Sequence, residues 1–216
     1  DAMNPATAAD TYNTAVGASA GLSVTTGVNN VLIGGLAGDA LTDADYNIAV
    51  GVGAVGSDTL GSGAIGIGQG ALGQQNFTTA TTNYNIGIGY AAGTAITTGT
   101  FNVLIGGEAG DALTDADLNV AIGYEALGAD TLGSRSVAVG PYALHFQNFT
   151  TATNTYNTAV GVDAGLKVTT GINNTLLGAL AGDALTDADN NTAVGRGSLG
   201  ADTLGSRAVA VGFGAL

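Results

Sequence analysis

A five-residue phrase, Asn-Thr-Ala-Val-Gly or a close variant, occurs twelve times in the 216-residue chain and constrains its fold more than any other feature. We number each copy from the residue in the asparagine place, called position 0. Successive copies are 17, 17, 17 and 21 residues apart, and this 72-residue pattern fills residues 1–72, 73–144 and 145–216. A fixed period is typical of repeat architectures, in which each unit buries its apolar side only by stacking on its neighbours. We therefore expect one elongated repeat domain over residues 1–216.

Three residues of each copy, at positions 1 to 3, follow the pattern of a short β-strand. Position 1 is Thr, Val or Ile, position 3 is Val, Ile or Leu, and position 2 is Ala, Gly or Leu. Side chains alternate across a strand, so positions 1 and 3 share one side, and apolar residues on both sides are typical of covered parallel strands. We expect an all-β fold, a parallel β-solenoid or β-roll of twelve coils. Positions 1 and 3 would fill each coil, and the side of position 2 would need a second cover, which another copy of the chain could supply.

Other positions repeat almost as strictly and predict the turns between strands. Position 4 is Gly in all twelve copies, which indicates a corner with positive φ or a backbone too close for a Cβ. Position 0 is Asn in nine copies, which favours a ladder of stacked amides along the rod. Position 12 is Thr in all nine 17-residue coils, which predicts a threonine ladder on a second short strand.

The charge balance excludes one class of partner. Four Lys and Arg residues face seventeen Asp and Glu residues, for a net charge of -13, so no surface that follows nucleic-acid phosphates is expected. Cysteine is absent, which excludes disulfides and thiolate metal sites. We expect no membrane partner, because no apolar run approaches the roughly 18 residues that a spanning helix needs. The first residues also lack the basic and apolar regions of a signal peptide.

Acidic loops recur once per 72 residues and are the candidate metal sites. Calcium favours clusters of carboxylate oxygens, so we assign these loops as candidate calcium ligands. The alternative is that the carboxylates form Asx turns and keep an apolar fibre soluble. The residues are Asp39, Asp43, Asp45, Asp111, Asp115, Asp117, Asp183, Asp187 and Asp189.

The longer coils supply candidate receptor-facing loops, because their four extra residues should protrude from the rod. Their tips are Asn76, Phe77 and Thr78, and Asn148, Phe149 and Thr150. The single histidine, His145, is expected to be an ordinary surface residue. The Gly-x-Gly-x-x-Gly run at residues 51–56 is interpreted as corners of the roll, because no helix follows it. No cofactor other than calcium is expected.

The repeats also resemble a known class of protein. Asn-Thr-Ala-Val-Gly-x-x-Ala with an intervening Thr-Thr-Gly-x-Asn-Asn, as in Asn157 to Asn174, resembles the repeats of phage and phage-like tail-fibre proteins. It is also similar to the head repeats of trimeric autotransporter adhesins of the YadA type. Those heads are trimers of left-handed parallel β-rolls, so the resemblance implies a homotrimer here. In such a trimer, position 2, including Leu104, would pack near the threefold axis. The adhesin coils are shorter than the coils of this chain.

These observations predict a structural or adhesive fibre segment, such as the shaft or head of a phage tail fibre or bacterial adhesin. It would lie on a virion or a bacterial cell surface, present a receptor-binding or glycan-binding surface, and catalyse no reaction. The alternative is a monomeric ice-binding solenoid that uses the threonine ladder. A hydrolytic fibre domain is less favoured, because the triplicated acidic loops lack an aromatic platform and the chain has no Trp.

Overall fold

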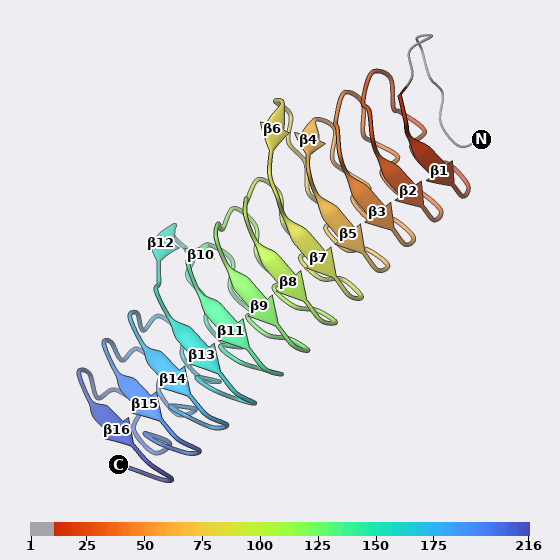
Figure 1. Ribbon diagram of the computed structural model, residues 1–216. Helices are drawn as coiled ribbons and strands as arrows, with labels where there is room; N and C mark the ends of the chain where they lie inside the picture. The colour runs from red at the N-terminus through yellow and green to blue at the C-terminus, as the bar shows by residue number, and fades with distance from the viewer. Residues whose placement is uncertain (1–10) are drawn as a thin grey trace.

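The chain forms a rod of stacked coils, seen along its length in Figure 1, in a computed structural model that describes residues 11–216. One strand from each coil joins a parallel sheet of twelve strands, and four two-residue strands form two further pairs. The large sheet contains, in spatial order, β1 (Thr14–Val16), β2 (Val31–Ile33), β3 (Ile48–Val50), β5 (Ile65–Ile67), β7 (Ile86–Ile88), β8 (Val103–Ile105), β9 (Val120–Ile122), β11 (Val137–Val139), β13 (Thr158–Val160), β14 (Thr175–Leu177), β15 (Thr192–Val194) and β16 (Val209–Val211).

Every strand pairs with the next copy in the same register. Ala15 lies opposite Leu32, and Leu32 lies opposite Ala49, so each coil position forms a straight row along the rod. The order of strands in the sheet is the order of the copies in the chain. The predicted all-β parallel solenoid of about twelve turns, with steps of about 17 residues, is therefore confirmed.

The two sides of each strand face in the opposite directions to those predicted from the sequence. Position 2 faces the interior, where Leu32, Leu104 and Leu176 are completely buried. Positions 1 and 3 face outward: on β14, Thr175 is half-buried and Leu177 is 37 % exposed. The prediction that positions 1 and 3 fill the coil and that Leu104 lies near a threefold axis was wrong.

Small and large side chains alternate inside the coil, which explains why position 2 varies in size. In the second coil of each unit, position 2 is Leu and position 8 is Gly. A Cβ built on Gly182 would lie 2.8 Å from Leu176 Cδ2 and 2.8 Å from Leu185 Cδ1. The glycine thus makes room for two leucines, as close packing of a narrow interior requires.

Glycine at position 4 has the two properties that the repeat predicted. Gly34 has φ of +133°, in a region that few residues with a Cβ adopt. A Cβ at Gly34 would also lie 2.5 Å from the carbonyl oxygen of Gly51 in the next coil. Each coil turns this corner against the corner of its neighbour, so the row admits no side chain.

The predicted asparagine ladder is present and buried. The backbone N–H of Asn102 donates to Oδ1 of Asn85 over 2.9 Å, and that of Asn119 donates to Oδ1 of Asn102 over 3.0 Å. The amide nitrogen Nδ2 of Asn102 donates to the carbonyl of Ala116 over 2.7 Å. Each amide therefore links its coil to the next and also closes the next turn.

The threonine row differs from its prediction. The hydroxyl of Thr42 donates to the carbonyl of Thr59 over 3.0 Å, and that of Thr114 donates to the carbonyl of Thr131 over 3.1 Å. The backbone at this row runs as turns and bends, so the second strand expected there is not formed. The hydroxyls thus bond along the rod, and the ice-binding alternative stays a prediction.

The two described 21-residue coils leave the row pattern and form the extra strand pairs. β4 (Gly61–Ser62) pairs with β6 (Thr81–Thr82), and β10 (Gly133–Ser134) pairs with β12 (Thr153–Asn154). Inside the first of these coils, Gln75 is buried. Its Nε2 donates to Asp58 Oδ2 over 2.6 Å, and its Oε1 accepts from Asn85 Nδ2 over 2.9 Å. These polar bonds carry the asparagine ladder across a coil whose position 0 is Ala64.

Candidate functional site

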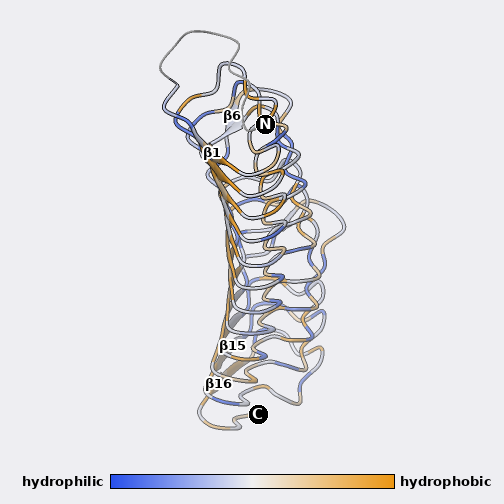
Figure 2. Ribbon diagram, turned by 90° about the vertical axis from the view of Figure 1, so that its right-hand side faces the viewer, coloured by the Kyte–Doolittle hydropathy of each residue, from blue (hydrophilic) through white to orange (hydrophobic). Residues whose placement is uncertain are grey.

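The outward side of the large sheet is the most extensive candidate surface. Positions 1 and 3 place a Thr or an aliphatic side chain on this side in every coil. Large apolar residues at the flanking positions −1 and 5 are also exposed, among them Tyr84 (58 %) and Tyr90 (59 %). Hydrophobic colouring follows the strands along one side of the rod in Figure 2. We call positions −1, 1, 3 and 5 of all copies the outer sheet face.

The outer sheet face is free of acidic residues. None of the seventeen Asp and Glu residues occupies position −1, 1, 3 or 5 in any copy. Three of the four cationic residues do, namely Arg135, Arg196 and Arg207. A chain of net charge -13 therefore keeps its negative charge away from this face. Apolar surface without like charges is well suited to contact with another molecule.

The acidic loops use their carboxylates to join neighbouring coils. Thr98 donates its hydroxyl to Asp115 Oδ1 over 2.6 Å, and the N–H of Thr100 donates to Asp117 Oδ1 over 2.7 Å. The other units make the same bonds, with Asp43 and Asp45 in the first and Asp187 and Asp189 in the third. Within residues 11–216, no group of three or more Asp, Glu, His or Cys residues is arranged to hold a metal ion. The carboxylates serve the turns, and calcium binding at these loops stays a prediction.

Asp39 and Asp111, at the start of the acidic loops, differ from their neighbours in environment. Partial burial raises the pKa of both carboxyl groups above the usual range, because it removes water from the charged form. At Asp111 the nearby Glu108 and Glu125 carboxylates raise the pKa further. Asp183 occupies the same row in the third unit. These residues lie on the turns and not on the outer sheet face.

The loops expected to face a receptor are only partly exposed. Phe77 is 5 % exposed and Phe149 is 6 % exposed, so both rings belong to the interior. The N–H of Phe77 also donates to buried Asp58 over 2.9 Å. Assigning the two phenylalanines to a receptor contact was therefore wrong. The tip residues Asn76 and Thr78, with their counterparts Asn148 and Thr150, are exposed.

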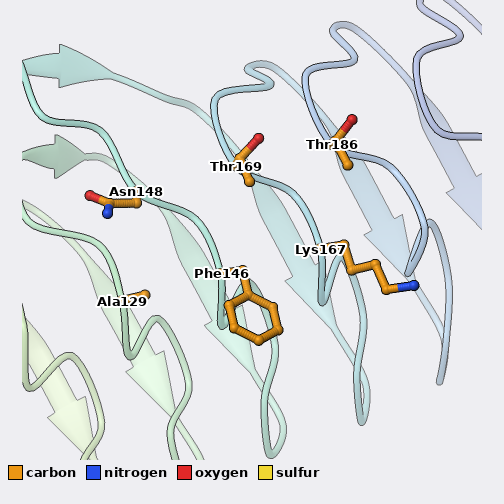
Figure 3. A pocket seen from close by; sticks show the side chains of 6 residues that line it. All are labelled: Ala129, Phe146, Asn148, Lys167, Thr169 and Thr186. Carbon is orange, nitrogen blue, oxygen red and sulfur yellow. The ribbon is translucent and has the colours of Figure 1, made fainter.

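A shallow hollow beside the second 21-residue coil has a volume of about 430 Å³. Figure 3 shows the side chains of Phe146 and Lys167 side by side on neighbouring coils, with Asn148, Thr169 and Thr186 along the next row. The row of Phe146 and Lys167 is otherwise filled by Ser or Ala, apart from Gln74 in the first long coil. The remaining lining residue is Ala129.

An aromatic cluster continues from this hollow across the turns, and the sequence reasoning did not find it. The rings of Tyr124 and Tyr142 pack edge to face, with their centroids 5.5 Å apart. The centroid of the His145 ring lies 5.6 Å from that of Tyr142 and 4.5 Å from that of Phe146. His145, expected as an ordinary surface residue, is half-buried, with Nδ1 3.5 Å from Glu125 Oε2. The signal lay in departures from the repeat, since the equivalent residues of the first unit are Val52, Gly70, Gly73 and Gln74.

Glutamates border this cluster and affect one of its tyrosines. Hydrogen bonding to the carboxylates of Glu125 and Glu108 raises the pKa of the exposed Tyr124 hydroxyl, because these anions oppose its ionisation. The phenol therefore stays protonated and donates at neutral pH. The cluster thus offers aromatic surface and a phenol donor on coils seven and eight of the rod.

A second hollow, of about 320 Å³, lies at the first 21-residue coil. Two exposed tyrosines, Tyr46 and Tyr84, line it together with Asp45. Gly63 lies between the two tyrosines in row −1 and leaves that row without a side chain at this coil. The remaining lining residues are Ser62 and Thr82.

Comparisons with protein-family models, curated proteins and solved structures found no match to this chain. Among residues 11–216, no helix is long and apolar enough to cross a membrane. The surfaces described above are therefore the basis for any statement about function.

Proposed function

We propose that this chain is a structural and adhesive segment of a homotrimeric fibre, of the kind found in phage tail fibres and bacterial surface adhesins. The observation that carries the proposal is the outer sheet face, which has only aliphatic or Thr side chains in its strand rows and no acidic residue along the whole described rod. The likeness of the repeats to those fibre proteins supports the same proposal.

The size of this face suits a stable assembly. Twelve strands at about 4.8 Å and a width of six residues at about 3.3 Å give ~1,100 Å² per chain. Stable two-chain interfaces bury about 800 Å² per partner. In a homotrimer each chain divides its face between two neighbours, ~550 Å² for each contact, and the three contacts together hold the assembly. Three chains with these faces turned inward would place their acidic loops outward.

The proposed mechanical role follows from the coil-to-coil bonds. Parallel strand pairing, the asparagine ladder and the threonine hydroxyls all run along the rod, so a pull or bend on one coil is shared with the next. A rigid rod of this kind would hold a receptor-binding surface away from a virion or a bacterial cell. The turns and the hollow beside Phe146 and Lys167 are the surfaces left for a receptor or a glycan.

The native mass in solution tests the proposal. Light scattering coupled to size exclusion should give three times the chain mass of 20.8 kDa. Ile67→Asp puts a charge on the outer sheet face and should reduce the mass to that of one chain. The matched control is Gln74→Asp, which adds a negative charge at an exposed residue of the same coil and should leave the trimer intact. A folded monomer for the unaltered chain would overturn the assembly.

A further inference from the structure

The hollow at Gly63 has a counterpart in the second unit that shows what fits it. Row −1 contains Arg135 at the equivalent coil of the second unit and Arg207 in the third. The three backbones agree: the N–H of Gly63 donates to Asp45 O over 3.0 Å, that of Arg135 to Asp117 O over 3.0 Å, and that of Arg207 to Asp189 O over 2.9 Å. The φ angles are also alike, at 77°, 66° and 63°. Only the side chain differs.

In the second unit, an arginine side chain reaches across the strand pair. Arg135 Nε donates to Asn154 Oδ1 over 3.0 Å, and Asn154 is the counterpart of Thr82 in the wall of the hollow. Gly63 has no such side chain, and the space of about 320 Å³ beside it is open. The fold therefore contains its own example of a guanidinium beside this wall.

The walls of the hollow have the chemistry that binds an organic cation. Tyr46 and Tyr84 supply aromatic surface, which attracts cations through the negative faces of the rings. Asp45 supplies a carboxylate whose Oδ1 accepts the N–H of Val28 over 2.8 Å. No donor among residues 11–216 is hydrogen-bonded to its second oxygen, Oδ2. Ser62 and Thr82 contribute hydroxyl oxygens, and the net charge of -13 attracts cations to the chain.

We propose that the hollow formed by Asp45, Tyr46, Ser62, Gly63, Thr82 and Tyr84 is a binding site for a guanidinium group. A planar guanidinium stacks on aromatic rings and donates several hydrogen bonds in one plane, so it uses both the tyrosines and the oxygen atoms of this site. The source is a small guanidinium compound, or an arginine side chain of a second copy of this chain. Tyr46, Gly63 and Tyr84 belong to row −1 of the outer sheet face, so in the proposed trimer this site would lie at the contact between chains.

Titration with methylguanidinium chloride, followed by NMR of the tyrosine ring protons, tests the site. The resonances of Tyr46 and Tyr84 should shift saturably, while equal concentrations of sodium chloride should leave them in place. Asp45→Asn keeps Oδ1 as an acceptor for Val28 but removes the charge, and it should weaken binding about tenfold, the loss of one charge-assisted bond. The absence of a saturable shift would overturn the proposal.

Gly63→Arg is the decisive variant, because the second and third units already carry Arg at this place. It should keep the fold and abolish the methylguanidinium shifts, since its own side chain occupies the hollow. Gly70→Arg adds the same charge on the same coil, at φ of +69° and with open space around its Cβ, and should retain the shifts. If Gly63→Arg binds the probe as well as Gly70→Arg does, the assignment of the site is wrong.

The native mass distinguishes the two sources of the guanidinium group. A mass that falls when methylguanidinium saturates the site would identify an arginine of a second copy as the native occupant. A mass that stays constant while the tyrosines shift would identify a free compound. Either result supports a guanidinium site. If the chain proves monomeric, the fibre proposal is wrong, and the tyrosine shifts still test the guanidinium site.

Discussion

Leu176 and Leu177 are neighbours on β14 with the same side chain, yet the sheet places them in different environments. Leu176 is completely buried inside the coil, and Leu177 is 37 % exposed on the outer sheet face. The same division holds for every described copy from the second onward, where position 2 is buried and positions 1 and 3 are not. Hydrophobicity alone therefore does not tell which side of a short solenoid strand is the core.

The side chains themselves suggest what does distinguish the two sides. Inside the coil, position 2 alternates between Leu and the small residues Ala and Gly, because each size must fit the residues across a narrow interior. Outside, position 1 and position 3 are mostly β-branched, and no residue there has to fit a neighbour across the coil. Variation in size marks the packed side, and uniformity marks the side that faces outward.

Replacing each of the two leucines by aspartate tests the difference between the inner and the outer side of β14 most directly. Leu176→Asp places a carboxylate among apolar atoms with no partner and should cost more than about 4 kcal/mol, enough to unfold the coils around it. Leu177→Asp reaches water and should cost about 1 kcal/mol or less in the separated chain. Urea unfolding followed by circular dichroism measures both values. Equal losses would mean that both sides of β14 are buried in solution.

The sequence predicted the parts of this fold that depend on strict repetition. Glycine at position 4 and asparagine at position 0 have one structural role each, and both roles were readable from residues such as Gly34 and Asn102. The calcium and receptor assignments rested on local composition alone. Asp115 and Phe77 are hydrogen-bonded to residues of the preceding coil, 17 to 19 residues earlier, and spacing within one loop does not reveal such bonds.

A search for sequence motifs does not find the two hollows, for a related physical reason. Gly63 and Phe146 matter because they differ from their counterparts, Arg135 and Gln74, in an otherwise regular row. In a repeat protein the backbone is common to all units, so the side chains that break the pattern are the ones that create local surfaces. Comparing units with one another finds these residues, whereas a search for known motifs does not.

The asparagine ladder tests the importance of the inner side of the coil in a second way, because it is a polar row there. Asn174→Ala removes the acceptor of the Asn191 N–H and the donor to the Ala188 carbonyl, which lie 3.0 and 2.7 Å from the Asn174 amide atoms. Two buried groups lose their partners, at about 1–3 kcal/mol each. Thermal unfolding should show a loss of about 2–4 kcal/mol, which is smaller than for Leu176→Asp. Asn173→Ala, beside it in row −1, is the control; it loses only the tolerance of Asn for the left-handed backbone at φ of +59° and should cost about 1 kcal/mol. Similar losses in the two variants would contradict a special role for position 0.

The smallest effect concerns the turns, which contain titrating carboxylates that the outer sheet face lacks. Burial raises the pKa of Asp111 in the folded chain, so the folded state binds its proton more tightly than the unfolded state does. Above the folded pKa the group is charged in both states and opposes folding. As the pH falls from about 7 towards the unfolded pKa of about 3.9, protonation removes this cost and the free energy of unfolding should rise.

Asp111→Asn should therefore stabilise the chain slightly at pH 7 and reduce this pH dependence, as measured by urea unfolding between pH 4 and pH 7. Asp115→Asn removes the same charge from an exposed residue of the same loop, so the difference between the two variants isolates the effect of burial from that of net charge. Neither residue lies on the outer sheet face, and both variants should keep the native mass of the unaltered chain. A change of mass in Asp111→Asn alone would place the turns, and not the sheet, at the contact between chains.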